Sequence, residues 1–125
     1  MRVALVTGAA QGVGFVTAKL FAEIGYHVVM TDVQPLDAQV QLLVAKGGSV
    51  SALSGDVSSE AFIIELAEKI AREHDAADVL VNNAGISLIC PAEETSTEQW
   101  QRVMNINLTG PFLLCREIGK QMLAR

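Results

Sequence analysis

The glycine-rich segment near the N-terminus constrains the fold of this chain more than any other sequence feature. Four apolar residues, 3–6, precede it, and glycines stand at positions 8, 12 and 14. An uninterrupted apolar run of this length fits a strand buried on both faces of a parallel sheet. Residues 13–24 then repeat apolar side chains at helical spacing, and Gly25 follows as a candidate helix cap. The order of strand, glycine-rich turn and helix predicts the start of a βαβ unit.

Strand and helix patterns continue to alternate along the chain. After the first pair we expect strands at 27–31, 49–53 and 78–82, and helices at 36–46, from a cap at Ser58 or Ser59 to about 73, and from 97 almost to the C-terminus. Ser96 with Gln99 matches a capping box for the last helix. Right-handed crossovers between such strands give a parallel sheet with helices on both faces. The sequence therefore predicts one domain, 1–125, with a Rossmann-type doubly wound α/β fold and the strand order 3-2-1-4.

The last predicted helix contains a local conflict, because Gly110 and Pro111 fall in its middle. Proline lacks the N–H that an intrahelical hydrogen bond requires. The helix therefore either kinks near Asn107 or breaks into two helices. We favour the kink, since apolar residues resume the helical period beyond the proline. These residues are Phe112, Leu113, Leu114, Ile118 and Met122.

Composition excludes several classes of protein. Hydrophobic residues make up 50% of the chain and charged residues 18%, which argues against intrinsic disorder. The net charge of -5 comes without a basic stripe, so we expect no nucleic-acid partner. No run of about 18 apolar residues occurs and the apolar start is too short for a secretion signal, so we expect no membrane span and a cytoplasmic protein. Cys90 and Cys115 lie outside any metal-ligand spacing, and buried or idle thiols are favoured over a disulfide.

The spacing of the three glycines suits a turn that holds a diphosphate. Gly8 permits a tight turn, Gly12 lets the backbone approach a pyrophosphate without a Cβ between them, and Gly14 allows the helix to pack closely on the strand. The start of the helix adds unpaired N–H groups and the positive end of the helix dipole. A glycine-rich turn without function is the alternative. The position between a strand and a helix favours dinucleotide binding.

Asp32 follows the second predicted strand, 18 positions after Gly14. A carboxylate at this place can accept hydrogen bonds from both hydroxyls of an adenosine ribose. It also repels a 2′-phosphate, and no Arg or Lys occurs at positions 9–13 or 31–37 to offset that charge. We therefore expect NAD as the cofactor in preference to NADP. The alternative is a solvated aspartate in a turn.

Four motifs, taken in order, resemble those of the short-chain dehydrogenase/reductase family. They are Thr-Gly-x-x-x-Gly-x-Gly at 7–14, Asp-Val at 56–57, Asn-Asn-Ala-Gly at 82–85 and Asn-Ile-Asn-Leu-Thr-Gly at 105–110. Together they cover the chain from residue 3 to about residue 115. The resemblance implies an oxidoreductase that transfers hydride between the nicotinamide of its cofactor and a small-molecule alcohol or carbonyl substrate.

The resemblance also assigns residues to the cofactor. The pyrophosphate and the ribose next to it would be held by Gly8, Gln11, Gly12, Val13 and Gly14. The adenine ribose would be held by Asp32, and the adenine ring by Asp56 and Val57. The cofactor site would be lined, and the sheet steadied, by Asn82, Ala84 and Gly85.

Asn107 matches the family's catalytic asparagine. In the family the backbone carbonyl of that asparagine supports a water molecule in a proton relay. A kink at Asn107 would free such a carbonyl, which gives the conflict in the last helix a functional reason. The alternative is that Asn107 only caps a broken helix.

The family's acid and base residues have no match. Its Tyr-x-x-x-Lys pair and an upstream Ser lie beyond the long helix, and the one Tyr of this sequence, Tyr26, is followed four positions later by Met30. Transfer of hydride to a carbonyl needs a proton donor poised near neutral pH. We therefore expect the 125 residues alone to supply cofactor binding and to be inactive. The residues do not indicate which substrate the family member would use.

Two other classes of function fit the same residues: a module that senses NAD without turnover, and an interaction protein that pairs with a separate catalytic half. Family members continue with strands beside the fourth, so the fourth strand is expected here as an open edge, which invites pairing with another chain. The last helix is also expected to expose apolar residues. We therefore expect a homo-oligomer that forms through this edge, this helix or both.

Overall fold

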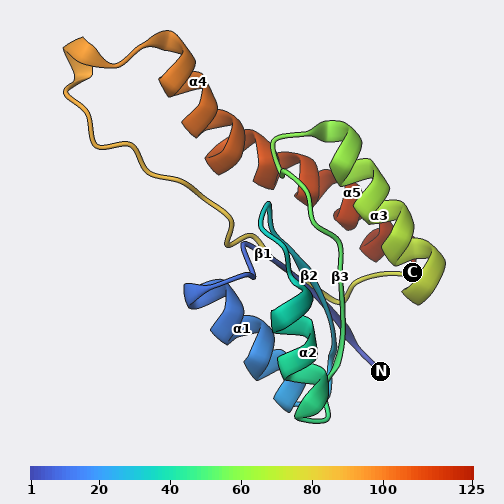
Figure 1. Ribbon diagram of the computed structural model, residues 1–125. Coiled ribbons are helices and arrows are strands. Elements are labelled where there is room, and N and C mark those ends of the chain that lie inside the picture. The colour runs from blue at the N-terminus through green and yellow to red at the C-terminus, as the bar shows by residue number, and fades with distance from the viewer.

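The computed structural model describes all residues from Met1 to Arg125 and places a parallel four-stranded sheet between two layers of helices (Figure 1). The strands are β1 (Val3–Thr7), β2 (His27–Thr31), β3 (Ser49–Ala52) and β4 (Val79–Val81). They lie in the order β3-β2-β1-β4, and all three pairings are parallel. The predicted sheet and strand order are therefore confirmed, and no predicted strand end is wrong by more than one residue.

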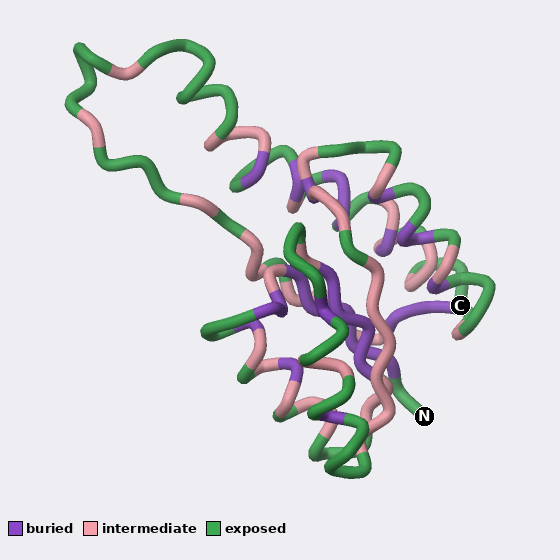
Figure 2. Tube along the Cα trace, in the orientation of Figure 1, coloured by how far each residue is buried: buried purple, intermediate pink, exposed green.

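Two helices cover each face of the sheet. They are α1 (Gly12–Glu23) and α2 (Asp37–Ala45) on one face, and α3 (Glu60–His74) and α5 (Gly110–Ala124) on the other. Three short elements precede α5: the 3-10 turn η1 (Ala92–Glu94), α4 (Thr97–Met104) and the π-helical turn η2 (Asn105–Thr109). The segment that leads to α4, and α4 itself, extend away from the sheet, and no residue of α4 is buried (Figures 1 and 2). None of the helices has both the length and the apolarity that crossing a membrane requires.

The core has two parts because successive residues of a strand point to opposite faces of the sheet. Leu5 packs in one cluster with Leu66 of α3 and Ile118 of α5. Its neighbour Val6 packs in the other cluster with Leu43 of α2. All five residues of β1 are buried, as its uninterrupted apolar run predicts (Figure 2). This rigid central strand ends where the glycine-rich loop begins.

Helix α1 is present as predicted, but only part of its apolar period faces the sheet. Of the apolar residues that give the segment its helical period, Val13, Val16, Leu20 and Ile24 are all more than half exposed. Phe21, from the same period, is partly buried and packs on the core. The buried residues of α1 are Gly14 and Ala18. These small residues let the helix axis approach the strands closely, and the partly buried Phe15 and Phe21 pack against the core beside them. The period therefore predicts the helix but identifies the face that packs on the sheet only in part.

The last helix is distorted near Asn107 but is not broken. Its residues remain helical from α4 through η2 into α5, and the N–H of Gly110 donates to the carbonyl of Asn105 five residues earlier. Pro111 follows the wider turn as the second residue of α5, and supplies no N–H to the carbonyl of Asn107 four residues earlier. The favoured prediction of one continuous helix is confirmed. The distortion takes the form of a π-helical turn, which often occurs at functional sites.

Two predicted helix caps are confirmed. The Ser59 hydroxyl accepts from the N–H of Phe62 at the start of α3, and Ser96 with Gln99 forms a capping box on α4. Cys90 lies in the segment before η1 and Cys115 lies in α5, and both are free thiols. Neither thiol is fully buried, and Cys115 is exposed.

Candidate functional site

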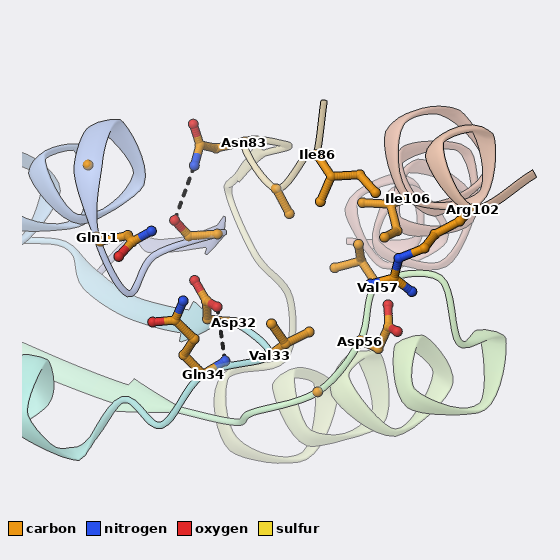
Figure 3. Close-up of a pocket in the computed structure, with 15 residues that line it drawn as sticks. Gln11, Asp32, Val33, Gln34, Asp56, Val57, Asn83, Ile86, Arg102 and Ile106 are labelled. Atoms are coloured by element: carbon orange, nitrogen blue, oxygen red, sulfur yellow. Dashed lines mark hydrogen bonds between the residues drawn. The ribbon is translucent and has the colours of Figure 1, made fainter. Parts of the chain in front are cut away.

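A pocket of about 430 Å³ opens at the carboxyl ends of the strands, lined by the segments that follow β1, β2, β3 and β4 (Figure 3). It lies where the strand order changes direction, since β1 pairs with β2 on one side and with β4 on the other. In open α/β sheets, ligands bind in this crevice. Eight residues predicted to contact the cofactor line the pocket: Gly8, Gln11, Gly12, Asp32, Asp56, Val57, Ala84 and Gly85.

Glycine occupies the three positions of the loop for different structural reasons. Gly8 has a φ of +64°, and a Cβ there would lie 2.8 Å from the amide nitrogen of Asn83. A Cβ on Gly14 would fall inside the van der Waals contact distance of the Gly8 carbonyl, so Gly14 lets α1 pack against the turn. Gly12 has a φ of +60° but faces open space. At Gly12 the protein itself occupies no volume that a side chain would fill, which leaves room for a ligand to approach the backbone.

Thr7 and Asn83 fix the glycine-rich loop to the segment that follows β4. The buried Thr7 hydroxyl oxygen accepts hydrogen bonds from the N–H groups of Asn83 (3.0 Å) and Ala84 (2.9 Å). The Asn83 side chain donates through Nδ2 to the carbonyl of Gly8 at 3.2 Å. Two segments 75 residues apart in the chain are thereby held together at one side of the pocket.

The Asp32 carboxylate ties the end of β2 to the same loop. Its Oδ2 accepts from the N–H of Ala10 at 2.9 Å, and its Oδ1 accepts from the N–H of Gln34 at 3.0 Å. A carboxylate has about four acceptor positions, so both oxygens can accept further hydrogen bonds. The carboxylate is therefore fixed in place and still able to bind hydroxyl groups in the pocket.

The start of α1 carries unsatisfied N–H groups beside this carboxylate. Ser59 and Ser96 cap α3 and α4 with their side chains, whereas Gln11, the residue before α1, makes no side-chain hydrogen bond to the helix. The first turn of α1 also holds no acidic residue. Free N–H groups and the positive end of the helix dipole make this terminus suited to an anion.

The far side of the pocket is formed by Asp56, Val57 and the last helix. Oδ1 of Asp56 accepts hydrogen bonds from the N–H (2.9 Å) and the hydroxyl (2.8 Å) of Ser58, which orient the carboxylate. A Cβ on Gly110 would lie 2.8 Å from the carbonyl of Val57. The glycine therefore allows the last helix to approach closely enough for Ile106 to line the pocket together with Val57.

Asn107 binds the backbone of Ile86 through both ends of its amide. Nδ2 donates to the Ile86 carbonyl at 2.7 Å, and Oδ1 accepts from the Ile86 N–H at 2.9 Å. An α-helix would pair the Asn107 carbonyl with the N–H of residue 111, which is a proline. Asn107 thus holds the segment after β4, and its carbonyl loses its ordinary helical partner.

Comparison with known proteins agrees with this geometry. A family model described as short chain dehydrogenase matches residues 2–125 of the chain. The chain belongs to the short-chain dehydrogenase family.

Relatives in this family include polyol dehydrogenases. A D-threitol dehydrogenase of Mycolicibacterium smegmatis is 39% identical over 98% of the chain, which spans 48% of that relative. An NAD-dependent glycerol dehydrogenase of Listeria innocua is 35% identical over 98% of the chain, which again spans 48% of the relative. The chain therefore spans about half the length of these curated relatives.

The fold also matches solved short-chain dehydrogenases. A metagenomic short-chain oxidoreductase in complex with NADP superposes with a TM-score of 0.93 at 35% identity, and the match covers 98% of this chain and 57% of that one. The order β3-β2-β1-β4 with helices on both faces is thus the N-terminal part of a Rossmann-type short-chain dehydrogenase fold.

Four of the residues predicted for the site of this short-chain dehydrogenase do not line the pocket. Val13 points to solvent, with 74% of its surface exposed, and Gly14 lies beneath Gly8. Asn82 turns its Nδ2 toward the Cys115 sulfur at 3.5 Å, and its neighbour Asn83 makes the contacts with the glycine-rich loop instead. Asn107 uses its side chain on Ile86, as described above.

Seven pocket residues are absent from the sequence prediction. They are Val33, Gln34, Gly55, Asn83, Ile86, Arg102 and Ile106. The first five lie within two positions of predicted residues at the carboxyl ends of strands, so their position alone is a usable signal. Arg102 and Ile106 lie one helical turn apart on the last helix, and only the tertiary structure brings that helix to the pocket.

The residues present suit a dinucleotide. Gly12 leaves open space next to its backbone, α1 offers uncapped N–H groups, and Asp32 keeps acceptor positions for hydroxyl groups. These groups complement a diphosphate joined to a ribose. No group of three or more His, Cys, Asp or Glu is arranged to hold a metal ion.

Proposed function

We propose that this chain is the NAD-binding part of an oxidoreductase that moves hydride between NAD(H) and an alcohol or carbonyl substrate. One observation carries the proposal. The Asp32 carboxylate is hydrogen-bonded to Ala10 of the glycine-rich loop, so a sugar-binding acid and the uncapped start of α1 share one pocket. That pairing of groups matches the alternation of diphosphate and ribose in a dinucleotide.

Individual roles follow from positions around the pocket. Gly12 and the first N–H groups of α1 bind the diphosphate, with Gly8 and Gln11 beside them. Asp32 binds the adenine ribose. The adenine base lies near Asp56 and Val57, and Ala84 and Gly85 border the chain of the cofactor beyond the diphosphate.

The preference for NAD over NADP rests on charge near the ribose. Asp32 would lie close to a 2′-phosphate, and positions 9–13 and 31–37 hold no Arg or Lys. Two like charges at hydrogen-bond distance disfavour binding unless a cation intervenes. Because the solved relative described above contains NADP, both cofactors must be compared directly.

The chemical step needs groups that these residues do not include. The bound nicotinamide would supply or accept the hydride, while the protein must place it and manage a proton. Asn107 would contribute a backbone carbonyl that Pro111 leaves without its α-helical N–H partner, and its side chain fixes Ile86. The 125 residues contain no Tyr-x-x-x-Lys, so we expect cofactor binding without turnover from this chain alone.

The substrate class that we propose is a small polyol. The support comes from two similar proteins named as threitol and glycerol dehydrogenases. A protein that contains this chain and is as long as the curated relatives can be assayed with NAD against threitol, glycerol and a simple secondary alcohol. Activity with the simple alcohol alone would reject the polyol class.

We also propose that the chain forms homo-oligomers. β4 has a neighbour on one side only, and the last helix exposes Leu108, Phe112 and Leu123. An unpaired strand edge beside exposed apolar residues favours pairing with a second copy. Light scattering should give a mass above that of a monomer, and a monodisperse monomer would count against this part of the proposal.

Calorimetry with NAD and NADP tests the proposed function. We expect NAD to bind with a millimolar or lower Kd and NADP to bind at least about tenfold more weakly, a difference of about 1.4 kcal/mol. Equal affinities would remove the NAD preference. The absence of binding by either cofactor would remove the function itself.

A further inference from the structure

One positively charged side chain, Arg102, lines the pocket. The fold and the binding role of the glycine-rich loop do not explain why a cation lies there. Of the 15 lining residues, Asp32 and Asp56 carry negative charge and Arg102 carries the only positive charge. Arg116 and Arg125 elsewhere in the chain form salt bridges, whereas Arg102 forms none. Its guanidinium therefore faces the pocket with its donors free.

Arg102 lies above an apolar surface at one end of the pocket. Ile106 follows it by one helical turn, and Ile106 and Val57 are both nearly buried, with 7% and 6% of their surfaces exposed. Figure 3 shows Arg102, Ile106, Val57 and Asp56 together, with Arg102 directed toward Asp56. Residues four apart on a helix lie on the same face, so α4 presents a cation directly next to this apolar surface.

No salt bridge joins the nearby Asp56 carboxylate to this guanidinium. Asp56 is oriented by Ser58, which donates two hydrogen bonds to its Oδ1. An arrangement of an apolar surface, an oriented hydrogen-bond acceptor and an unpaired planar cation suits an aromatic base that carries an amino group. The base can lie against Val57 and Ile106, while a guanidinium stacks on its exposed face.

We infer that Arg102 is an affinity-determining residue that stacks on the adenine base of the bound cofactor. This inference rests on the proposed function, because it assumes that an adenine nucleotide occupies the pocket. Arg102 lies at the Asp56 end, whereas Asp32 and Gln34 lie toward the opposite end, near Gln11 (Figure 3). Arg102 therefore acts on the base and not on a 2′-phosphate of the ribose.

Calorimetry with ADP-ribose and its 2′-phosphate tests the inference without any turnover. R102Q should weaken binding of ADP-ribose about tenfold, and it should weaken the 2′-phosphorylated ligand by the same factor. R102K should recover only part of the loss, because an ammonium lacks the planar face of a guanidinium. R72Q, which removes an exposed arginine from α3, should bind like the unsubstituted chain, and all three variants should melt within a few degrees of it.

Other outcomes overturn the inference in distinguishable ways. Unchanged binding by R102Q would show that Arg102 does not contact the ligand. A loss confined to the 2′-phosphorylated ligand would make Arg102 a phosphate-binding residue, and full recovery by R102K would reduce its role to that of a point charge. If the unsubstituted chain binds neither ligand, the proposed function fails together with the inference.

Discussion

Oδ2 of Asp32 accepts a hydrogen bond from the N–H of Ala10 at 2.9 Å, across 22 positions of sequence. The contact sets the distance between the carboxyl end of β2 and the glycine-rich loop before any ligand binds. A preformed site of this kind loses little conformational freedom on binding, which favours affinity. The same carboxylate thus has a structural role and the recognition role that we propose for it.

Substitution of Asp32 tests that recognition role. Asp32→Asn keeps a hydrogen-bond acceptor for one backbone N–H but removes the charge that opposes a 2′-phosphate. We expect NAD affinity to fall about tenfold, or about 1.4 kcal/mol. The ratio of NAD affinity to NADP affinity should fall by more than that factor, because NADP binding no longer meets an opposing charge. Isothermal calorimetry with each cofactor measures both effects.

Asp37→Asn provides the matched control. Asp37 lies in the first turn of α2, close to Asp32 in sequence but outside the pocket. Asp37→Asn changes the net charge by the same amount as Asp32→Asn. If both variants shift the cofactor ratio equally, net charge explains the preference and contact with Asp32 does not.

The glycines of the loop should respond differently to alanine. At Gly14 a Cβ would overlap the Gly8 carbonyl and the Asn83 amide, so we expect Gly14→Ala to lower the free energy of unfolding by about 3 kcal/mol or more. At Gly12 a Cβ meets no protein atom, and only the positive φ opposes it, which costs about 1–2 kcal/mol. Gly12→Ala should therefore remain folded while losing at least about tenfold in NAD affinity.

Gly47→Ala separates backbone strain from ligand contact. Gly47 also has a positive φ, +90°, and open space around it, but it lies beyond α2 and away from the pocket. Urea denaturation and calorimetry should show a loss of stability like that of Gly12→Ala with NAD binding intact. Equal loss of binding in both variants would mean that strain alone reduces affinity.

Asn107 should hold the segment after β4 in place. Asn107→Ala removes both partners of the Ile86 backbone, and the expected loss of stability is about 1–3 kcal/mol. The amide hydrogen of Ile86 should exchange markedly faster in the variant. Asn105→Ala is the control, since Asn105 lies in the same π-helical turn and its side chain accepts a hydrogen bond from Gln101, at 3.4 Å, and none from Ile86. Unaltered exchange at Ile86 would contradict this role.

We expect the free energy of unfolding to decrease as the pH is lowered, because of His27. Its ring packs on that of His74 with centroids 4.3 Å apart, and its two nitrogens contact the hydroxyls of Ser49 and Ser51. Burial, and then the nearby His74, lower the pKa of His27 below its ordinary value of 6.5, with Glu73 opposing and Lys69 adding to the shift. The folded state therefore binds this proton less readily than the unfolded state does.

The sign of the pH effect follows from this lowered pKa. Stability should decline as pH falls through about 6.5, and the decline should stop once the pH is below the pKa of His27 in the folded chain. Urea denaturation between pH 8 and pH 5 measures it. His27→Asn should flatten the profile, and an unchanged slope would assign the effect to other groups.

Local sequence signals predict the sheet well because they depend on burial and turn chemistry. Each signal depends on the local environment of its own position in the chain. The examples are the apolar run of β1, the glycines after it and Asp32 at the end of β2. Strand order then follows from the handedness of crossovers. The same signals are incomplete for the packed face of α1. Phe21 of the predicted period packs on the core, but the buried residues of the helix are Gly14 and Ala18, whose small size a hydrophobic period does not detect.

The site is predicted less completely than the fold because some of its contacts are set by distant segments. Asn83 and Asn82 are identical residues in adjacent positions, and only the direction of the backbone after β4 decides which one reaches Gly8. Arg102 lies 70 positions from Asp32 and enters the pocket because Gly110 lets the last helix approach Val57. No local pattern encodes that approach.

The most direct measurement of the central claim is an NMR titration of the isotope-labelled chain with NAD, following the backbone amides. We expect the amides of Gly12, Val13 and Gly14 to shift most, because they would donate to the diphosphate, and the amides of Ala10 and Gln34 to shift with them as Asp32 binds the ribose. The shift changes of all five amides should follow the same binding curve, with one Kd. Saturable shifts elsewhere, with the start of α1 unaffected, would contradict the account.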